Sequence, residues 1–239
     1  MPDDSGIAPI TTVTLCGYPA ASRVWAFNQM GSARRALGQV EGLRFWKLLG
    51  TGHGRGFSLR PDFSRYGLLA VWEHRAAANA FFERSTLVAG YRSHAREVWT
   101  AYLETSSAHG AWSGVNPFLP AGAHNGSGPV AVLTRASIRW SRLRAFWRAV
   151  PQTTVALDRA GGLLASIGTG ETPVVRPATF SLWRSTADLE AYAYQAQEHV
   201  AVIRRRQDEG WYTEELFARF RPIESTGTWN GTDPLQGLL

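Results

Sequence analysis

A histidine on the apolar side of a predicted helix is the residue of this sequence best suited to bind a metal ion. Helical periodicity runs from Thr186 to Gln207, and within it Tyr192, Ala196, His199 and Ile203 fall on one stripe. A buried neutral imidazole needs a partner for each ring nitrogen, and a metal ion is one such partner. Two interpretations of His199 follow from the pattern: a metal ligand, or a core histidine whose nitrogens are hydrogen-bonded.

A glycine-rich segment, FWKLLGTGHGRGFSLRPD, is the second candidate for a ligand site, and its glycines alternate at Gly50, Gly52, Gly54 and Gly56. Glycine allows the backbone to approach a ligand closely. No Lys-Ser/Thr pair follows, and the G-x-G-x-x-G order of a dinucleotide site is missing. The segment is either a simple hairpin or a loop beside a ligand, where Lys47, His53 and Arg55 could hold carboxylates or phosphate.

The elements that carry these residues occur twice. SRVWAF from Ser22 recurs as SRLRAF from Ser141, and LLGTG recurs as SIGTG with Gly50 matched to Gly168. Strands ending at Trp72 and Trp183 also match, and HGAWSGVNPF is repeated as TGTWNGTDPL. Four matches in the same order indicate a duplication with a long repeat, unlike that of a solenoid. Extending the shift of the last match places His199 opposite Phe82.

The residue pattern of each repeat predicts the element order β-α-β-β-α-β, which is that of the ferredoxin-like unit. Ser22 and Ser141 are expected to cap the first helix of each unit. The second helix is expected over Arg75–Glu83, with a possible continuation to Arg96, and over Thr186–Gln207. We expect one repeat at 8–118, a linker at 119–128 and a second repeat at 129–235. Helices would cover one face of each antiparallel sheet, and the two sheets would bury their other faces together in an α+β fold.

Composition restricts the possible functions. Hydrophobic residues make up 44% of the chain and charged residues 18%, and there are ten tryptophans and a net charge of +6. The single cysteine excludes an intrachain disulfide and a four-thiolate zinc site. The N-terminus has no apolar segment, so a cytoplasmic protein is expected. The positive charge is mostly dispersed; peripheral contact with a membrane is possible, whereas no aromatic motif for nucleic acid is present.

Taken together, FWKLLGTGHGRGF, LLAVW, GAWSGVNPF, VLTRASIRW and the H-x-x-x-I-R…WYTEELFARF pattern resemble the spheroidene monooxygenase family of acyclic-carotenoid ketolases. The resemblance extends from about Thr12 to Gly231. It implies a haem b enzyme that inserts oxygen from O2 into an apolar substrate. It also implies that the two repeats form a dimeric α/β barrel within one chain.

The same resemblance implies site residues. Haem proteins of this architecture carry their axial histidine on a helix over the second sheet, and His199 lies on the matching element. Arg204, Arg55 and Lys47 would meet the haem propionates. The aromatic side chains Trp183, Trp211 and Phe57 would enclose the porphyrin, and the four alternating glycines would shape the side where O2 or substrate binds.

Two alternatives remain at this point. A haem enzyme could instead perform N–O chemistry, as an aldoxime dehydratase does, and would then need no O2. A haem carrier or a cofactor-free barrel protein would bind without catalysis, with His199 as a core residue in the cofactor-free case. For the monooxygenase, the lack of a flavin or nicotinamide fingerprint implies an external electron donor, ferredoxin-like or a reductase. A homodimer is also possible.

Overall fold

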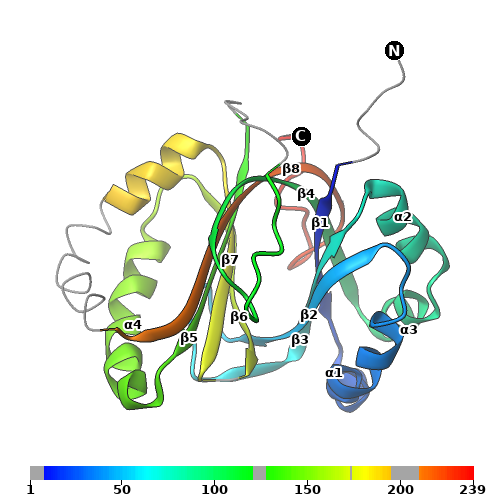
Figure 1. The fold of residues 1–239 in the computed structure, drawn as a ribbon, viewed down its shortest axis with the longest axis horizontal. Helices are drawn as coiled ribbons and strands as arrows, with labels where there is room; N and C mark the ends of the chain where they lie inside the picture. The colour runs from blue at the N-terminus through cyan, green and yellow to red at the C-terminus, as the bar shows by residue number, and fades with distance from the viewer. Residues whose placement is uncertain (1–7, 121–127, 173, 195–209) are drawn as a thin grey trace.

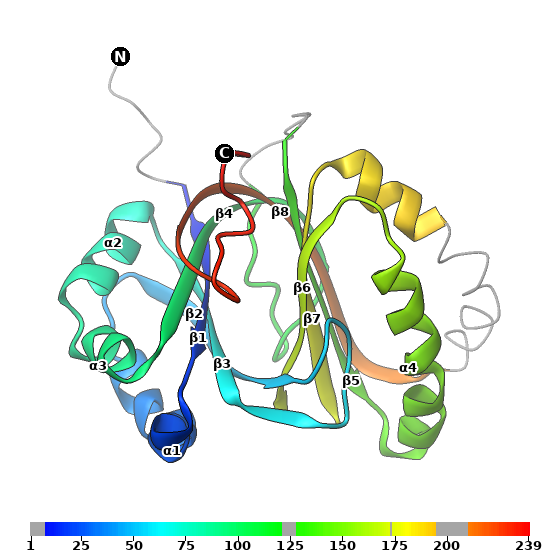
Figure 2. The same cartoon turned by 180° about the vertical axis from the view of Figure 1, so that it is seen from behind.

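Antiparallel strands close into a single barrel, with helices against two opposite sides of it (Figures 1 and 2). The computed structural model describes residues 8–120, 128–172, 174–194 and 210–239. Around the barrel the strand order is β1-β3-β2-β6-β7-β5-β8-β4. The strands of the first half are therefore contiguous, as are those of the second, and the predicted duplicated α/β barrel is confirmed.

The first half follows the predicted element order, with its second helix in two pieces. Its elements are β1 (Ile10–Gly17), α1 (Arg23–Leu37), β2 (Leu43–Gly52), β3 (Pro61–Trp72), α2 (Arg75–Arg84), α3 (Thr86–His94) and β4 (Glu97–Gly110). The second half comprises β5 (Val130–Ile138), α4 (Leu143–Asp158), β6 (Leu163–Thr172), β7 (Arg176–Trp183), a helical stretch at 186–194, and β8 (Tyr212–Gly227). As predicted, β3 and β7 each end at a tryptophan, Trp72 and Trp183.

The barrel interior is the largest hydrophobic core. Alternate residues of the strands point into it, because side chains one position apart on a strand lie on opposite faces. It includes large rings from both halves, among them Trp99, Trp112, Phe180 and Phe220, all with exposed fractions of 2% or less. Since both halves contribute to this core, the inner face of each sheet is buried only when the other half is present.

The halves meet along two seams of different length. The β4–β8 seam is long, running from the Trp99–Gly227 pair to the Gly110–Leu216 pair. The β2–β6 seam has only two pairs, Gly50 with Gly170 and Thr51 with Thr169. The repeated Gly-Thr-Gly segments thus lie side by side at the short seam.

The repeated Trp-Ser/Asn-Gly segments form matching tight turns. Trp112 donates its N–H to the carbonyl of Val115 and Trp229 to that of Thr232, each at 2.7 Å. The two residues after each tryptophan have positive φ, Ser113 and Gly114 in one turn and Asn230 and Gly231 in the other, as a type I′ turn requires.

Each of these turns is held by a glutamate of the opposite half. Glu214 accepts the backbone N–H groups of Ser113 at 3.1 Å and Gly114 at 2.7 Å. Glu97 accepts the N–H of Gly231 at 3.1 Å. Glu97 and Glu214 are separated by the same interval, 214 − 97 = 117, as Trp112 and Trp229, 229 − 112 = 117. The final turn of each repeat is therefore docked reciprocally onto the other repeat.

The expected serine cap is found in position only at Ser22 and is wrong for Ser141. Ser22 occupies the N-cap position of α1, but its side chain makes no capping bond, and Ser141 lies inside a short 3-10 helix (Trp140–Arg142) that precedes α4. A similar 3-10 helix precedes α1 and supplies an alternative hydrogen-bonding route at the helix start. The helix expected over Arg75–Glu83 is confirmed as α2, Arg75–Arg84, and its possible continuation to Arg96 is a separate helix, α3, after a break at Ser85.

The break at Ser85 has a local cause. Ser85 is extended, with φ −71° and ψ 127°, and its hydroxyl accepts the N–H of Leu87, so this residue ends α2 and caps α3. In the second half, residues 186–194 are helical, and the remainder of the predicted Thr186–Gln207 helix lies outside the described residues. No helix in the described ranges combines the length and apolar character needed to cross a membrane.

Candidate functional site

A cluster of charged side chains lies inside the barrel at the short seam. Lys47 on β2 donates to Glu171 on β6 at 2.8 Å, and Glu171 also accepts from Trp112 Nε1 at 2.7 Å. Arg135 on β5 is 2% exposed; its Nη2 lies 3.6 Å from Glu171, and its Nη1 donates to Glu214 on β8. We call Lys47, Arg135, Glu171 and Glu214 the buried charge cluster. It links four strands from both halves.

The glutamates of this cluster are held in their charged form. Burial by itself would raise the pKa of Glu171, but hydrogen bonds from Lys47 and Trp112 and the charges of Lys47 and Arg135 outweigh burial and lower that pKa. For Glu214, the opposing effect of burial is likewise outweighed by the N–H groups of Gly114 and Ser113 and by Arg135, which lower the pKa.

This protonation linkage predicts an acid-sensitive fold. A carboxyl whose pKa is lower in the folded state than in the unfolded state stabilises the fold when it is ionised. This contribution is complete at pH values above the unfolded pKa, near 4.5, and it is lost as the pH falls through the folded pKa. We expect the free energy of unfolding to decrease below about pH 4.5. Urea denaturation across this range should show a shallower decrease for Glu171→Gln than for the parent. Identical pH dependence in the two proteins would contradict the prediction.

The space between helices and sheet is filled in the first half. Leu48, Leu68, Phe81 and Phe82 are all buried there in one hydrophobic cluster. Phe81 and Phe82 pack on each other with ring centroids 5.3 Å apart, and Phe81 also packs on Trp72 at 5.1 Å. Two small spaces on this side of the barrel measure about 20 and 10 Å³.

The described residues of the second half leave a cavity at the corresponding place. A cavity of about 280 Å³ lies on the helix side of its sheet. We call it the repeat-2 cavity; it is lined by strand residues that include Val132, Thr134, Ser166, Thr179, Ser181 and Phe217, and by Leu157, Trp183, Leu189, Tyr192 and Ala193. The hollow is large enough for part of a small organic ligand and is mainly apolar.

Equivalent positions explain the difference between the halves. Matching Gly50 with Gly168 pairs Leu48 with Ser166, and matching Trp72 with Trp183 pairs Leu68 with Thr179 and Phe82 with Ala193. Each pair replaces a large apolar side chain of the first half with a smaller one. The second pairing also corrects the expected alignment of His199 with Phe82, because the shift near this helix is 183 − 72 = 111, not 117.

The glycine-rich loop of the first half closes one side of the repeat-2 cavity. This β2–β3 loop reaches across β6 (Figure 2), where Ser166 donates to the backbone carbonyl of Arg55 at 2.7 Å. A Cβ on Gly168 would lie 1.9 Å from the carbonyl oxygen of Gly56. The close approach of the two backbones requires glycine at 168, and it places Gly56 and Phe57 at the cavity wall.

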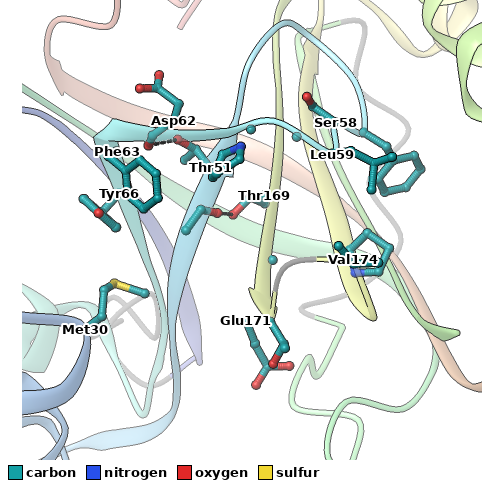
Figure 3. A pocket seen from close by; sticks show the side chains of 18 of the residues that line it. Met30, Thr51, Ser58, Leu59, Asp62, Phe63, Tyr66, Thr169, Glu171 and Val174 are labelled. Carbon is teal, nitrogen blue, oxygen red and sulfur yellow. Dashed lines mark hydrogen bonds between the residues drawn. The ribbon is translucent and has the colours of Figure 1, made fainter. Parts of the chain in front are cut away.

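A second hollow lies over the short seam, between α1 and α4 (Figure 3). We call it the seam groove; its volume is about 220 Å³. Gly50, Gly52, Gly168 and Gly170 line it from the two strands of the seam, together with the apolar residues Phe27, Met30, Phe57, Leu59, Phe63, Trp147 and Val174. Phe57 lines both the seam groove and the repeat-2 cavity, so the two hollows share one side chain as a partition.

The predicted site residues divide into several groups. Trp183, Gly56 and Phe57 line the repeat-2 cavity, whereas Gly50 and Gly52 line the seam groove. Gly54, with φ of 88°, sits at the exposed tip of the loop, and the side chain of Arg55 is exposed nearby.

Two predicted residues lie away from the cavity. Lys47 faces the barrel interior and is already paired with Glu171, so we do not place it in a cofactor site. Trp211 is 2% exposed and packs with Ile138, Phe146 and Val150 beneath α4 rather than against the cavity. Its indole N–H finds no hydrogen-bond partner within the part of the chain that the structure describes. His199 and Arg204 lie outside the described residues.

Comparison with known proteins identifies the family. The chain is 36% identical to spheroidene monooxygenase of Rhodobacter capsulatus over 95% of both chains. It is 39% identical to the Rubrivivax gelatinosus protein of that name, over 93% of this chain and 85% of the relative. The chain belongs to the spheroidene monooxygenase family. These relatives support an oxidoreductase of the monooxygenase class. A search of family models found no match.

Solved structures that are similar to this spheroidene monooxygenase family member share its fold. An aldoxime dehydratase in complex with butyraldoxime matches with a TM-score of 0.56 at 11% identity, covering 99% of this chain and 86% of the other. A second aldoxime dehydratase structure matches with a TM-score of 0.55 at 12% identity, over 96% and 86% of the two chains. At this identity the likeness establishes the shared barrel architecture.

Several features of this family member were missed from the sequence. Arg135, Glu171 and Glu214 belong to the buried charge cluster with Lys47, yet they are far apart along the chain. A usable signal was present for Arg135, which shares the inward face of its strand with Ala131 and Leu133 by period-two alternation. An arginine in such a row predicts a buried acidic partner, although the alternation cannot say which one.

Proposed function

We propose that this protein is a haem-dependent monooxygenase that acts on an apolar, carotenoid-like substrate. The observation that supports this proposal best is the repeat-2 cavity, which occurs where the equivalent space of the first half is packed with phenylalanine and leucine. A duplicated fold that empties one of its two helix-to-sheet spaces has lost packing there, and a bound group in that space would restore it. The spheroidene monooxygenase relatives support the reaction class.

The described residues around the cavity would contact part of a flat, mostly apolar cofactor such as haem b. Trp183 and Tyr192 form an aromatic wall with ring centroids 4.9 Å apart. Arg219 also lines the cavity; it is 34% exposed and lies 4.0 Å from Glu190, where it could meet a carboxylate such as a haem propionate. His199 would supply the axial ligand and Arg204 a further cation, as the family resemblance implies.

In this proposal the chain binds, orients and shields while the cofactor supplies the O2 chemistry that protein side chains lack. One oxygen atom of O2 enters a C–H bond of the substrate and the other leaves as water. Two electrons come from an external donor and two protons from the donor or solvent. The apolar lining of the cavity would exclude water from the reacting centre. The serine and threonine hydroxyls of the cavity floor supply its polar contacts.

The first test is a visible absorption spectrum of protein produced with ample haem, compared with His199→Ala. We expect a Soret band in the parent that is lost or displaced in His199→Ala and retained in His109→Ala, a control at an exposed histidine of β4. A parent that remains colourless during haem titration would refute haem dependence. Given a Soret band, turnover that continues without O2 would favour the N–O chemistry of a dehydratase over oxygenation.

A further inference from the structure

The seam groove is an apolar surface left open to solvent. Three of its lining side chains are large, hydrophobic and exposed: Phe27 at 57%, Leu59 at 55% and Phe63 at 53%. They come from α1, from the β2–β3 loop and from β3, and Phe27 and Phe63 face each other with ring centroids 6.3 Å apart. Such a gathering of exposed apolar groups around one hollow is typical of a binding site.

Four polar side chains of the groove, those of Thr51, Asp62, Thr169 and Glu171, are hydrogen-bonded within the protein. Thr51 donates its hydroxyl to the carbonyl of Arg65 at 2.9 Å, and Thr169 donates to that of Gly50 at 2.8 Å. Asp62 accepts from the N–H and hydroxyl of Ser64, and Glu171 belongs to the buried charge cluster. Tyr66 also lines the groove, and its buried hydroxyl has no hydrogen-bond partner among the described residues. Apart from that one hydroxyl, the groove offers a mainly apolar surface to a ligand.

The floor of the groove is bare backbone, because glycines line both strands of the seam. At three of these positions glycine is needed for the fold: a Cβ would lie 2.8 Å from Ser58 at Gly52, 1.9 Å from Gly56 at Gly168 and 2.5 Å from Arg176 at Gly170. At Gly50 the nearest atom to an added Cβ is 3.8 Å away. The fold therefore does not require glycine at position 50, whereas a ligand lying flat on the floor would.

The geometry points to the seam groove as the binding site for the long apolar chain of the substrate. One end of this chain would pass Phe57 and enter the repeat-2 cavity. Phe57 packs against Phe146 of α4 at 5.6 Å between ring centroids and lines both hollows. The identity of the substrate rests on the proposed function. The groove itself predicts an extended, unbranched or thinly branched apolar ligand, such as an open-chain polyene.

The test measures binding without turnover. Spheroidene in detergent micelles is titrated into the protein without reductant, and affinity is followed by quenching of tryptophan fluorescence, since Trp147 lines the groove. Two variants block the groove: Gly50→Leu fills its floor and Leu59→Asp puts a charge in its wall. Leu119→Asp is the matched control, because Leu119 is 53% exposed against 55% for Leu59 and does not line the groove.

We expect Gly50→Leu and Leu59→Asp each to weaken the affinity at least about tenfold, and Leu119→Asp to leave it nearly unchanged. All variants should keep the parent's melting temperature and Soret band. Equal affinity in all four proteins, or no binding by the parent, would overturn the groove assignment while leaving haem dependence standing. If the parent shows no Soret band but its affinity for spheroidene still depends on Gly50 and Leu59, haem dependence is refuted and the assignment of the groove as a binding site stands.

Discussion

Replacing Arg135 with methionine should lower the free energy of unfolding by roughly 3–5 kcal/mol. Arg135 is 2% exposed, and its guanidinium bridges Glu171 and Glu214 from two strands of the barrel. Methionine preserves much of the side-chain volume, so the main loss is the positive charge. Removal of that charge leaves Glu214 without an ion partner among the described residues and leaves Glu171 with Lys47 and the indole N–H of Trp112.

Urea denaturation monitored by circular dichroism would measure the loss. The control is Arg221→Met, because Arg221 is 44% exposed and pairs with Glu104 at 2.5 Å on the outer surface, where an ion pair contributes less than about 1 kcal/mol. The double variant Arg135→Met with Glu214→Gln should recover part of the stability, since it also removes the stranded carboxylate. Similar losses for Arg135→Met and Arg221→Met would show that the cluster does not stabilise the barrel.

The second large effect is expected at Gly168. Alanine there would place its Cβ 1.9 Å from the carbonyl oxygen of Gly56 and 3.3 Å from Cα of Phe57, both backbone atoms of the docked β2–β3 loop. Neither atom can yield by rotating a side chain, so the loop must move away from β6. We expect a loss of roughly 1–3 kcal/mol of stability, as for other overpacked sites, and faster proteolysis of the loop.

The duplication supplies a matched control for Gly168→Ala. Gly50 is the equivalent residue of the first half, and an added Cβ there meets only the carbonyl oxygen of Gly170 at 3.8 Å, an ordinary contact. Gly50→Ala should therefore change the melting temperature and the protease sensitivity much less. Equal effects of the two substitutions would contradict the inference that glycine is needed at position 168 for the β2–β3 loop to pack on β6.

Much of the architecture was predictable because most of the repeated residues have structural roles at equivalent places in the two halves. The Gly-Thr-Gly segments meet at the short seam, the Trp-Ser/Asn-Gly segments form positive-φ turns, and Trp72 and Trp183 end equivalent strands. The break at Ser85 was harder to predict, because a serine within a helical pattern is compatible with both continuation and capping.

The candidate site was less predictable than the fold. Alternation along β2 places Lys47 on the same face as Phe45 and Leu49, so its inward direction could have been read from the sequence. The repeat-2 cavity could not be read in this way, since it arises from three small residues, Ser166, Thr179 and Ala193, on separate elements. Each looks unremarkable alone, and only the comparison with Leu48, Leu68 and Phe82 in the other half shows the missing volume.

The duplication has a further consequence for how this protein could change over time. In an assembly of two identical chains every substitution appears twice, so a residue that enlarges one pocket enlarges both and costs stability at both. Once the copies are joined, Phe81 and Phe82 can fill one pocket while Tyr192 and Ala193 leave the other open. The filled half then acts as a rigid scaffold, and the open half is free to adapt its lining to a ligand.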